Sequence, residues 1–174
     1  PLTLEEGLDH FAGEAYADVE LDIDMKIPGY EREVVEGLTS RGLADRALIS
    51  SFYLHSLDKV AALAPEIRRG LSVPLVKRDY TQTVLALPAY GIARVIAHTY
   101  LPRKIRRLMH EGRIQAVMSH WILVSRGLVE AVHAEGGEVY VWTVDDLKRI
   151  DRLRRLGVHA VITNDPRLFA TPQL

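Results

Sequence analysis

The stretch ELDIDMK carries an acidic residue at every second position and ends in a lysine. On a β-strand, Glu20, Asp22, Asp24 and Lys26 share one face, and the apolar residues between them share the other. Carboxylates held this close together repel one another unless a cation lies among them. The row can therefore be an ion-pair network closed by Lys26, or a set of oxygen ligands for a divalent cation such as Mg²⁺ or Ca²⁺.

Polar and aromatic residues also end the other apolar runs of the chain. They are Ser50, Ser51, Phe52, Ser119, His120, Trp142, Thr143, Thr163 and Asn164. In parallel α/β proteins the active site lies at the carboxyl ends of the strands. Hydroxyls beside carboxylates, a cation and a large aromatic ring suit an anionic, metal-assisted substrate better than an apolar ligand. In the structural alternative, Trp142 fills the core and His120 is a hydrogen-bonded structural residue.

The elements that would position these residues alternate along the chain. Apolar runs predict six strands, at about 18–26, 47–52, 67–73, 114–120, 138–144 and 159–163. Helical spacing predicts helices at 4–11 behind a Thr3 cap, 30–42 before Gly42, 57–66 capped by Ser56, 83–98 broken or kinked at Pro88, 103–112, 127–137 and 146–157 capped by Asp145. Strands that alternate with helices predict parallel β/α units.

A chain of this α/β class can form an open doubly wound sheet or a closed barrel. No G-x-G-x-x-G or G-x-x-x-x-G-K-[ST] turn marks the nucleotide site that is typical of the open sheet. A complete barrel takes roughly 200 residues or more, so six units in 174 residues would be a barrel without its first two. Periodicity alone does not decide between the two architectures. In either, we expect a single domain over residues 1–174.

Composition excludes several classes of function. The chain has 22 Lys and Arg against 23 Asp and Glu, a balance that gives no argument for a nucleic-acid partner. The absence of cysteine excludes disulfides, thiolate zinc sites and a cysteine nucleophile. No apolar run is long enough to span a membrane and no signal-peptide pattern is visible, so we expect a cytoplasmic location. The serines of ALISSF stand in no G-x-S-x-G turn, which argues against a nucleophilic serine.

Six motifs follow one another along the chain: PLTLEEGL, LDIDMK, LISSF, LAPEIRRGL, EVYVWTVDD and LGVHAVITNDP. In their order and rough spacing they resemble the glycerophosphodiester phosphodiesterase family. The resemblance implies a parallel β/α barrel of the TIM type, of which this chain would hold about six of the eight β/α units. It also implies hydrolysis of a small-molecule glycerophosphodiester to an alcohol and glycerol 3-phosphate, assisted by a divalent cation.

The resemblance assigns roles to four residues. Asp24 takes the place of a metal-binding glutamate, and Lys26 takes that of an active-site lysine. Phe52 and Trp142 would bind the substrate. Because aspartate is one methylene shorter than glutamate, the Asp24 carboxylate would fall about 1.5 Å short of the family's position.

A second alignment register matches Glu20 and Asp22 to the acidic pair on the family's second strand. We prefer the first register because PLTLEE precedes the acidic row and ISSF follows it at the expected distance. The family's two acid–base histidines stand in H-R-G and H-D motifs, and none of the seven histidines of this chain does. We therefore expect the chain to correspond to the third through eighth strands, with the histidine pair upstream.

Two alternatives to a diester hydrolase remain open. One is a catalytically inactive barrel remnant that binds a phosphate ligand or a protein partner. The other is a lyase-type phospholipase on the same barrel, which would need the same histidines. Exposed edges at missing strands would also favour a homo-oligomer of the isolated chain.

Overall fold

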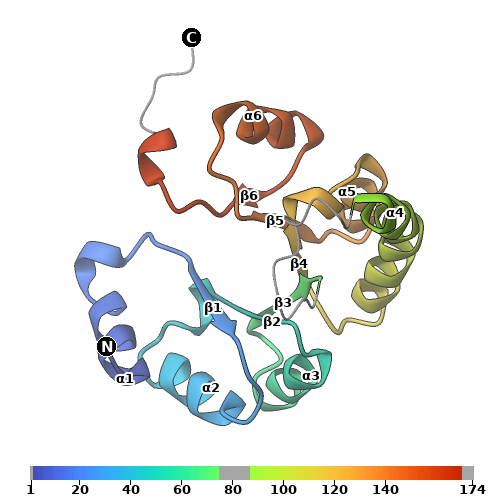
Figure 1. Cartoon of the computed structure of the whole chain (residues 1–174). Coiled ribbons are helices and arrows are strands. Elements are labelled where there is room, and N and C mark those ends of the chain that lie inside the picture. Colours follow the sequence, from blue (N-terminus) through green and yellow to red (C-terminus); the bar gives the residue numbers. More distant parts are fainter. Residues whose placement is uncertain (1, 75–86, 170–174) are drawn as a thin grey trace. The chain divides into compact units, whose positions relative to one another are not determined.

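The computed structural model describes residues 2–74 and 87–169 and contains two compact units, Pro1–Ser72 and Val73–Leu174 (Figure 1). Three strands begin in each unit, and every recorded pairing within a unit is parallel. A helix follows each of the first five strands in the chain. The expected class, a parallel β/α fold with about six units, is confirmed. A single domain over residues 1–174 stays a prediction.

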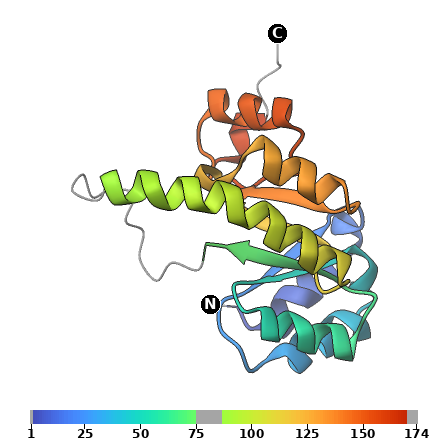
Figure 2. The ribbon, with the colours of Figure 1, turned by 90° about the vertical axis from the view of Figure 1, so that its right-hand side faces the viewer.

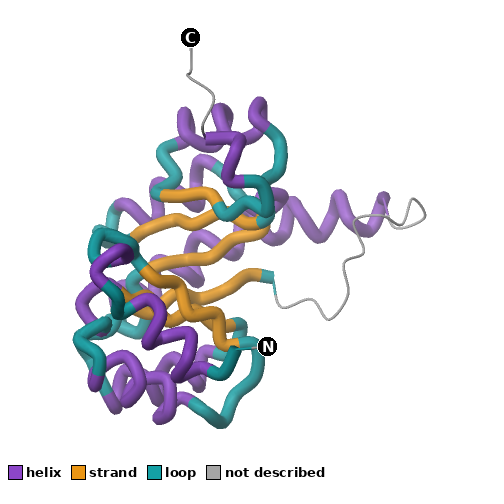
Figure 3. Tube along the Cα trace, turned by 90° about the vertical axis from the view of Figure 1, so that its left-hand side faces the viewer, coloured by secondary structure: helices purple, strands orange, loops and turns teal. Residues whose placement is uncertain are grey.

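The first unit contains an N-terminal helix, two strand–helix repeats and a third strand. Its elements are α1 (Leu4–Phe11), β1 (Leu21–Met25), α2 (Glu31–Ser40), β2 (Ala47–Ser51), α3 (Leu54–Leu63) and β3 (Arg68–Val73). Asp24 of β1 lies opposite Ser50 of β2, and Ser50 lies opposite Gly70 of β3. The core between strands and helices is apolar, with Leu38, Ile49 and Leu57 fully buried. The carboxyl ends of β1 and β2 are thereby held side by side (Figure 3).

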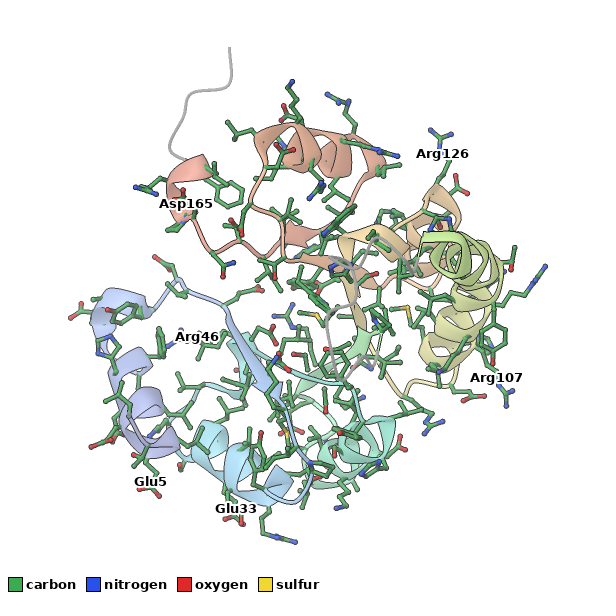
Figure 4. All side chains as sticks on the ribbon, viewed as in Figure 1. Glu5, Glu33, Arg46, Arg107, Arg126 and Asp165 are labelled. Atoms are coloured by element: carbon green, nitrogen blue, oxygen red, sulfur yellow. The ribbon has the colours of Figure 1, made fainter. Side chains whose placement is uncertain are left out.

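Two devices fix the connection that leads into β1. Thr3 and Glu6 form the capping box that the sequence predicts at the start of α1. Arg46 donates hydrogen bonds to the backbone carbonyls of Phe11 and Tyr16, at 2.5 and 2.8 Å. Its labelled side chain lies beside this connection in Figure 4. The guanidinium thereby provides hydrogen-bond donors for backbone carbonyls of the connection between α1 and β1.

The second unit contains the longest described helix and three strands. Its elements are α4 (Leu87–His110), β4 (Ala116–His120), α5 (Arg126–His133), β5 (Glu138–Trp142), α6 (Leu147–Leu156) and β6 (Ala160–Val161). In register, His120 lies opposite Trp142, and Val141 lies opposite Val161. The last strand is shorter than the predicted 159–163. Ala160 and Val161 lie in register with β5, and the His159 and Ile162 N–H groups on either side of them donate hydrogen bonds to carbonyls of β5.

Helix α4 corrects the prediction of two separate helices, at 83–98 and at 103–112, the first of them broken or kinked at Pro88. It is described from Leu87 to His110 without interruption, and it includes Pro102 as well (Figure 2). Pro88 stands in the first turn of the described helix, where its missing N–H costs no hydrogen bond. Residues 83–86 of the predicted helix lie outside the described part. Within the part of the chain that the structure describes, no helix combines the length and hydropathy that crossing a membrane requires.

Two predicted helix caps are wrong by a few residues. Helix α3 begins at Leu54, so Ser56 lies in its first turn and is fully buried. Helix α6 is capped by Asp146, whose carboxylate accepts the Arg149 N–H at 2.8 Å. Asp145 instead accepts hydrogen bonds from Thr163 and Asn164. At α6 two neighbouring aspartates fit the capping pattern, whereas α3 begins after Tyr53, which makes no side-chain capping hydrogen bond.

Candidate functional site

The acidic row occupies one face of β1, as the alternation predicts. Leu21 and Met25 are buried, at 6 % and 0 % exposed, and face the core of the first unit. Asp22 and Asp24 point to the other face and are open to solvent. Lys26 follows directly after the last residue of the strand. A carboxylate row and an ammonium group are therefore presented together at the carboxyl end of β1.

Three of the predicted site residues contact one another at this strand end. The Lys26 ammonium forms an ion pair with the Asp24 carboxylate. It also lies 5.8 Å from the centroid of the Phe52 ring, within the range of a cation–π contact. The Lys26 side chain remains 70 % exposed, so these contacts orient the ammonium without withdrawing it from solvent. The group can therefore present a positive charge to an anionic ligand.

Asp22 lies on the same face and is held by the neighbouring strand. The hydroxyl of the buried Ser50 donates to Asp22 Oδ1 at 2.7 Å. Protein atoms crowd the carboxyl and raise the pKa of Asp22, an effect that the Ser50 hydrogen bond opposes. The negative charge of Asp24 adds to this rise, and the positive charge of Lys26 opposes it. Asp22 thus gains from any additional cation that approaches the row.

The donor set of this face fits part of the coordination shell of a hard divalent cation. Asp22 and Asp24 offer carboxylate oxygens on one face of one strand, and Mg²⁺ and Ca²⁺ prefer such ligands. Among residues 2–74 and 87–169, no cluster of three or more His, Cys, Asp or Glu is placed to hold an ion. In the first unit, Asp24 is paired with Lys26, and Glu20 is paired with Arg68 at 3.0 Å. The ion-pair interpretation therefore describes Asp24 and Lys26, and the cation-ligand interpretation stays a prediction.

Trp142 lies in the second unit, on the face of β5 opposite to the buried Val139 and Val141. Its indole N–H donates to the carbonyl oxygen of Met118 at 2.9 Å, which fixes the ring against β4. The His120 ring packs edge-on against it, with the centroids 5.0 Å apart. Trp142 is half-buried rather than enclosed, so it differs from the core residue of the structural alternative. An oriented aromatic wall stands at the carboxyl ends of β4 and β5.

One aromatic contact of this wall was not predicted. The Arg149 guanidinium lies 3.7 Å from the centroid of the Trp121 ring. Trp121 follows β4, and Arg149 comes from α6, so the contact ties the helix to the strand end. Arg149 has the spacing of an ordinary exposed helix residue, and no local signal in the sequence indicates this contact.

Asp145 joins the loops that follow β5 and β6. It accepts hydrogen bonds from the Thr163 hydroxyl at 2.7 Å and from the Asn164 backbone and side-chain N–H groups at 2.8 and 2.9 Å. These bonds, with the Thr163 hydroxyl first, hold the pKa of Asp145 below its usual 3.8. Thr163 and Asn164, predicted near the mouth of the last strand, therefore serve to close this loop pair.

Replacing Asp145 with asparagine should destabilise the protein in a pH-dependent way. Because the folded state lowers the pKa of Asp145, its contribution to stability is present above the unfolded value of 3.8 and is lost as the pH falls through the folded value. We expect Asp145→Asn to lower the urea midpoint at pH 7 and to lower it progressively less below about pH 4. Urea unfolding of both proteins across this range measures the effect, and an equal difference at pH 7 and pH 3 would contradict it.

The sequence and the fold were compared with those of known proteins. Residues 2–168 match the model of the Glycerophosphoryl diester phosphodiesterase family. A glycerophosphodiester phosphodiesterase of Caldanaerobacter subterraneus subsp. tengcongensis is 26 % identical over 139 residues, which cover 80 % of this chain and 47 % of the relative. The chain thus spans about half the length of this curated relative. The resemblance that the six motifs indicate is confirmed.

Solved structures agree with the fold. A glycerophosphodiester phosphodiesterase from Parabacteroides distasonis superimposes with a TM-score of 0.69 at 18 % identity and covers 98 % of this chain and 65 % of its own. An Oleispira antarctica phosphodiesterase, solved in complex with its product sn-glycerol-3-phosphate, gives a TM-score of 0.60 at 19 % identity, over 97 % of this chain and 61 % of its own. At such identities the likeness concerns the fold, and it confirms the expected β/α architecture of the TIM-barrel type.

Proposed function

We propose, since the chain belongs to the glycerophosphoryl diester phosphodiesterase family, that it is part of an enzyme that hydrolyses glycerophosphodiesters to an alcohol and glycerol 3-phosphate. The observation that carries the proposal is the contact of Lys26 with Asp24 and Phe52 at the end of β1. These residues came from the motif resemblance, and the fold brings them together. The product bound to the Oleispira antarctica phosphodiesterase supports the same substrate class.

Lys26 supplies the positive charge for the reacting phosphodiester in this mechanism. Hydrolysis adds an oxygen to phosphorus, and negative charge accumulates on the phosphoryl oxygens in the transition state. An ammonium held beside those oxygens stabilises this charge without reorganising during the reaction. The Phe52 ring restricts where the ammonium can move, and Asp24 draws it back toward β1.

A divalent cation completes this half of the site. Asp24, with Asp22 beside it, would hold Mg²⁺ or Ca²⁺ through carboxylate oxygens, and Ca²⁺ tolerates the irregular geometry of a shortened side chain better. When bound, such an ion neutralises the charge of the phosphodiester. Asp22 keeps its orientation through the Ser50 hydroxyl, which leaves its second oxygen for a ligand.

The acid–base step requires groups other than Lys26. A pair of histidines would take the proton of the nucleophile and return one to the leaving alkoxide. We place this pair upstream of Pro1, because none of the seven histidines of this sequence stands in the family's H-R-G or H-D motif. Trp142, with its fixed ring, would line the glycerol side of the pocket.

The first experiment is an assay of the protein expressed from its own gene, together with its intact mass. A mass several kilodaltons above 19.6 kDa would agree with histidines carried upstream. We expect the release of glycerol 3-phosphate from diesters such as glycerophosphocholine, dependent on Mg²⁺ or Ca²⁺. Glycerol 3-phosphate itself should persist, because the proposed activity cleaves diesters and not monoesters. No release from any glycerophosphodiester with either cation would overturn the proposal.

A further inference from the structure

Glu31 is a buried carboxylate that the proposed chemistry does not use. It is the first residue of α2 and only 4 % exposed. Glutamate is rarely buried to this extent unless other groups compensate its charge. The residue stands five positions after Lys26, at the far end of the loop that connects β1 to α2. The contacts that hold Glu31 in this position therefore matter for the placement of Lys26.

Three groups compensate the Glu31 carboxylate. The Gly29 N–H donates to Oε2 at 3.2 Å, and the Lys59 ammonium lies 3.6 Å from the same oxygen. Burial alone would raise the pKa of Glu31, but the nearby Ser56 hydroxyl, backbone N–H groups and the positive charge of Lys59 outweigh it and lower the pKa. The carboxylate is therefore ionised and anchored from two sides.

One side belongs to the loop that follows β1, and the other belongs to α3, the helix that follows β2. Gly29 lies in the loop that begins at Lys26, and it adopts φ = +116°, a conformation that favours glycine. Ser56 and Lys59 lie on α3, which starts two residues after Phe52. One carboxylate thus connects the loop after the lysine to the helix after the aromatic ring.

We propose that Glu31 is a positioning residue of the phosphodiesterase site, which locks the Lys26 loop to α3 and so fixes the Lys26 ammonium against the Phe52 ring. This inference rests on the proposed function for its effect on hydrolysis, while the lock itself is a property of the fold. Among the described residues, the exposed Lys26 side chain has two orienting contacts, with Asp24 and with Phe52. A shift of its loop by about 1 Å would cost on the order of 10-fold to 100-fold in rate.

Glu31→Gln tests the lock, because it keeps the size of the side chain and removes its charge. We expect kcat to fall on the order of 10-fold, with a smaller change in KM. The matched control is Glu33→Gln, in the first turn of the same helix, where the labelled side chain points away from the strands (Figure 4). Glu33→Gln should leave kcat within about two-fold of the parent. Equal kcat values in the two variants would overturn the inference.

A double substitution shows whether Glu31 acts through Lys26. In a Lys26→Ala background, Glu31→Gln should produce no further loss, because the group that it positions is gone. Losses that multiply would show that Glu31 supports the site by another route and would overturn the inference. Lys59→Gln provides a second, smaller perturbation from the α3 side. It removes the ion pair with Glu31 Oε2 and should reproduce part of the fall in kcat without disturbing Gly29.

Hydrogen exchange tests the lock without any substrate. In Glu31→Gln, the backbone amides of Ile27, Gly29 and Tyr30 and of residues 53–56 should exchange on the order of 10-fold faster, while those of β1 and β2 keep their rates. Unchanged exchange in both loops would overturn the inference, whatever the activity. If the parent protein releases no glycerol 3-phosphate but the loops respond, the proposed function fails and the lock stands. The two failures are therefore distinguishable.

Discussion

Lys26→Ala is expected to lower kcat/KM for glycerophosphodiesters by roughly 100-fold to 1000-fold in the protein expressed from its own gene. The substitution removes the one ammonium that the described part of the first unit places against both Asp24 and Phe52. The loss should be larger in kcat than in KM, because the charge that Lys26 offsets grows in the transition state. Steady-state kinetics with one diester, at saturating cation, measures it.

The effect should be catalytic rather than structural. Because the Lys26 side chain is 70 % exposed, its removal should change the free energy of unfolding by less than about 1 kcal/mol. Lys148→Ala, on the exposed face of α6, is the matched control and should retain full activity. Lys26→Arg keeps the charge but not the compact ammonium, so we expect partial activity. A Lys26→Ala protein with parental kcat/KM would remove Lys26 from the site.

The arrangement of strands could be predicted because it depends on patterns that are local in the sequence. Leu21, Ile23 and Met25 alternate with acids, and the fold places the two sets on opposite faces of β1. In β2 all five residues from Ala47 to Ser51 are buried, as a strand covered on both faces requires. The parallel order follows from the helix in each gap. These features need no knowledge of distant contacts.

Element ends were less predictable, because several residues can perform the same local task. Asp145 and Asp146 both fit the cap of α6, and the hydrogen bonds from Thr163 and Asn164 hold the first of them in another role. Ser56 fitted a helix cap but lies inside α3, near the Glu31 carboxylate. In each case the choice is made by a partner more than a dozen residues away. Sequence spacing does not contain that information.

The proposed site residues also divide into those that a local pattern indicates and those that only distant contacts reveal. Asp24, Lys26 and Phe52 could be named because they end adjacent strands and match family motifs, and parallel pairing brings such ends together. Glu31 could not, because its position near the start of α2 is typical of an exposed acid that complements the helix dipole. Its burial accompanies an ion pair with Lys59 of α3, a residue far along the chain. The supporting residues of a site are therefore less visible in the sequence than the reacting ones.

Asp24→Ala should raise the concentration of Mg²⁺ or Ca²⁺ that gives half-maximal hydrolysis by more than about 10-fold. The substitution removes the carboxylate that the family motif assigns to the cation. Asp24→Glu should do the opposite, because one more methylene extends the carboxylate by about 1.5 Å toward the family's position. Calorimetric titration of each protein with the cation measures affinity directly, and hydrolysis at varied cation concentration measures it through activity.

Asp22→Asn distinguishes the two alignment registers. In the preferred register Asp22 lies beside the cation and Asp24 binds it. Burial opposes the charge of Asp22, and the Ser50 hydroxyl holds one of its oxygens. Asp22→Asn should therefore weaken cation binding less than Asp24→Asn does. In the other register, Glu20 and Asp22 are the ligands and the order is reversed. Glu20 is already paired with Arg68, which leaves it poorly placed to bind a cation. A larger loss in Asp22→Asn would therefore require the Glu20–Arg68 pair to open, and Arg68→Ala would then strengthen cation binding.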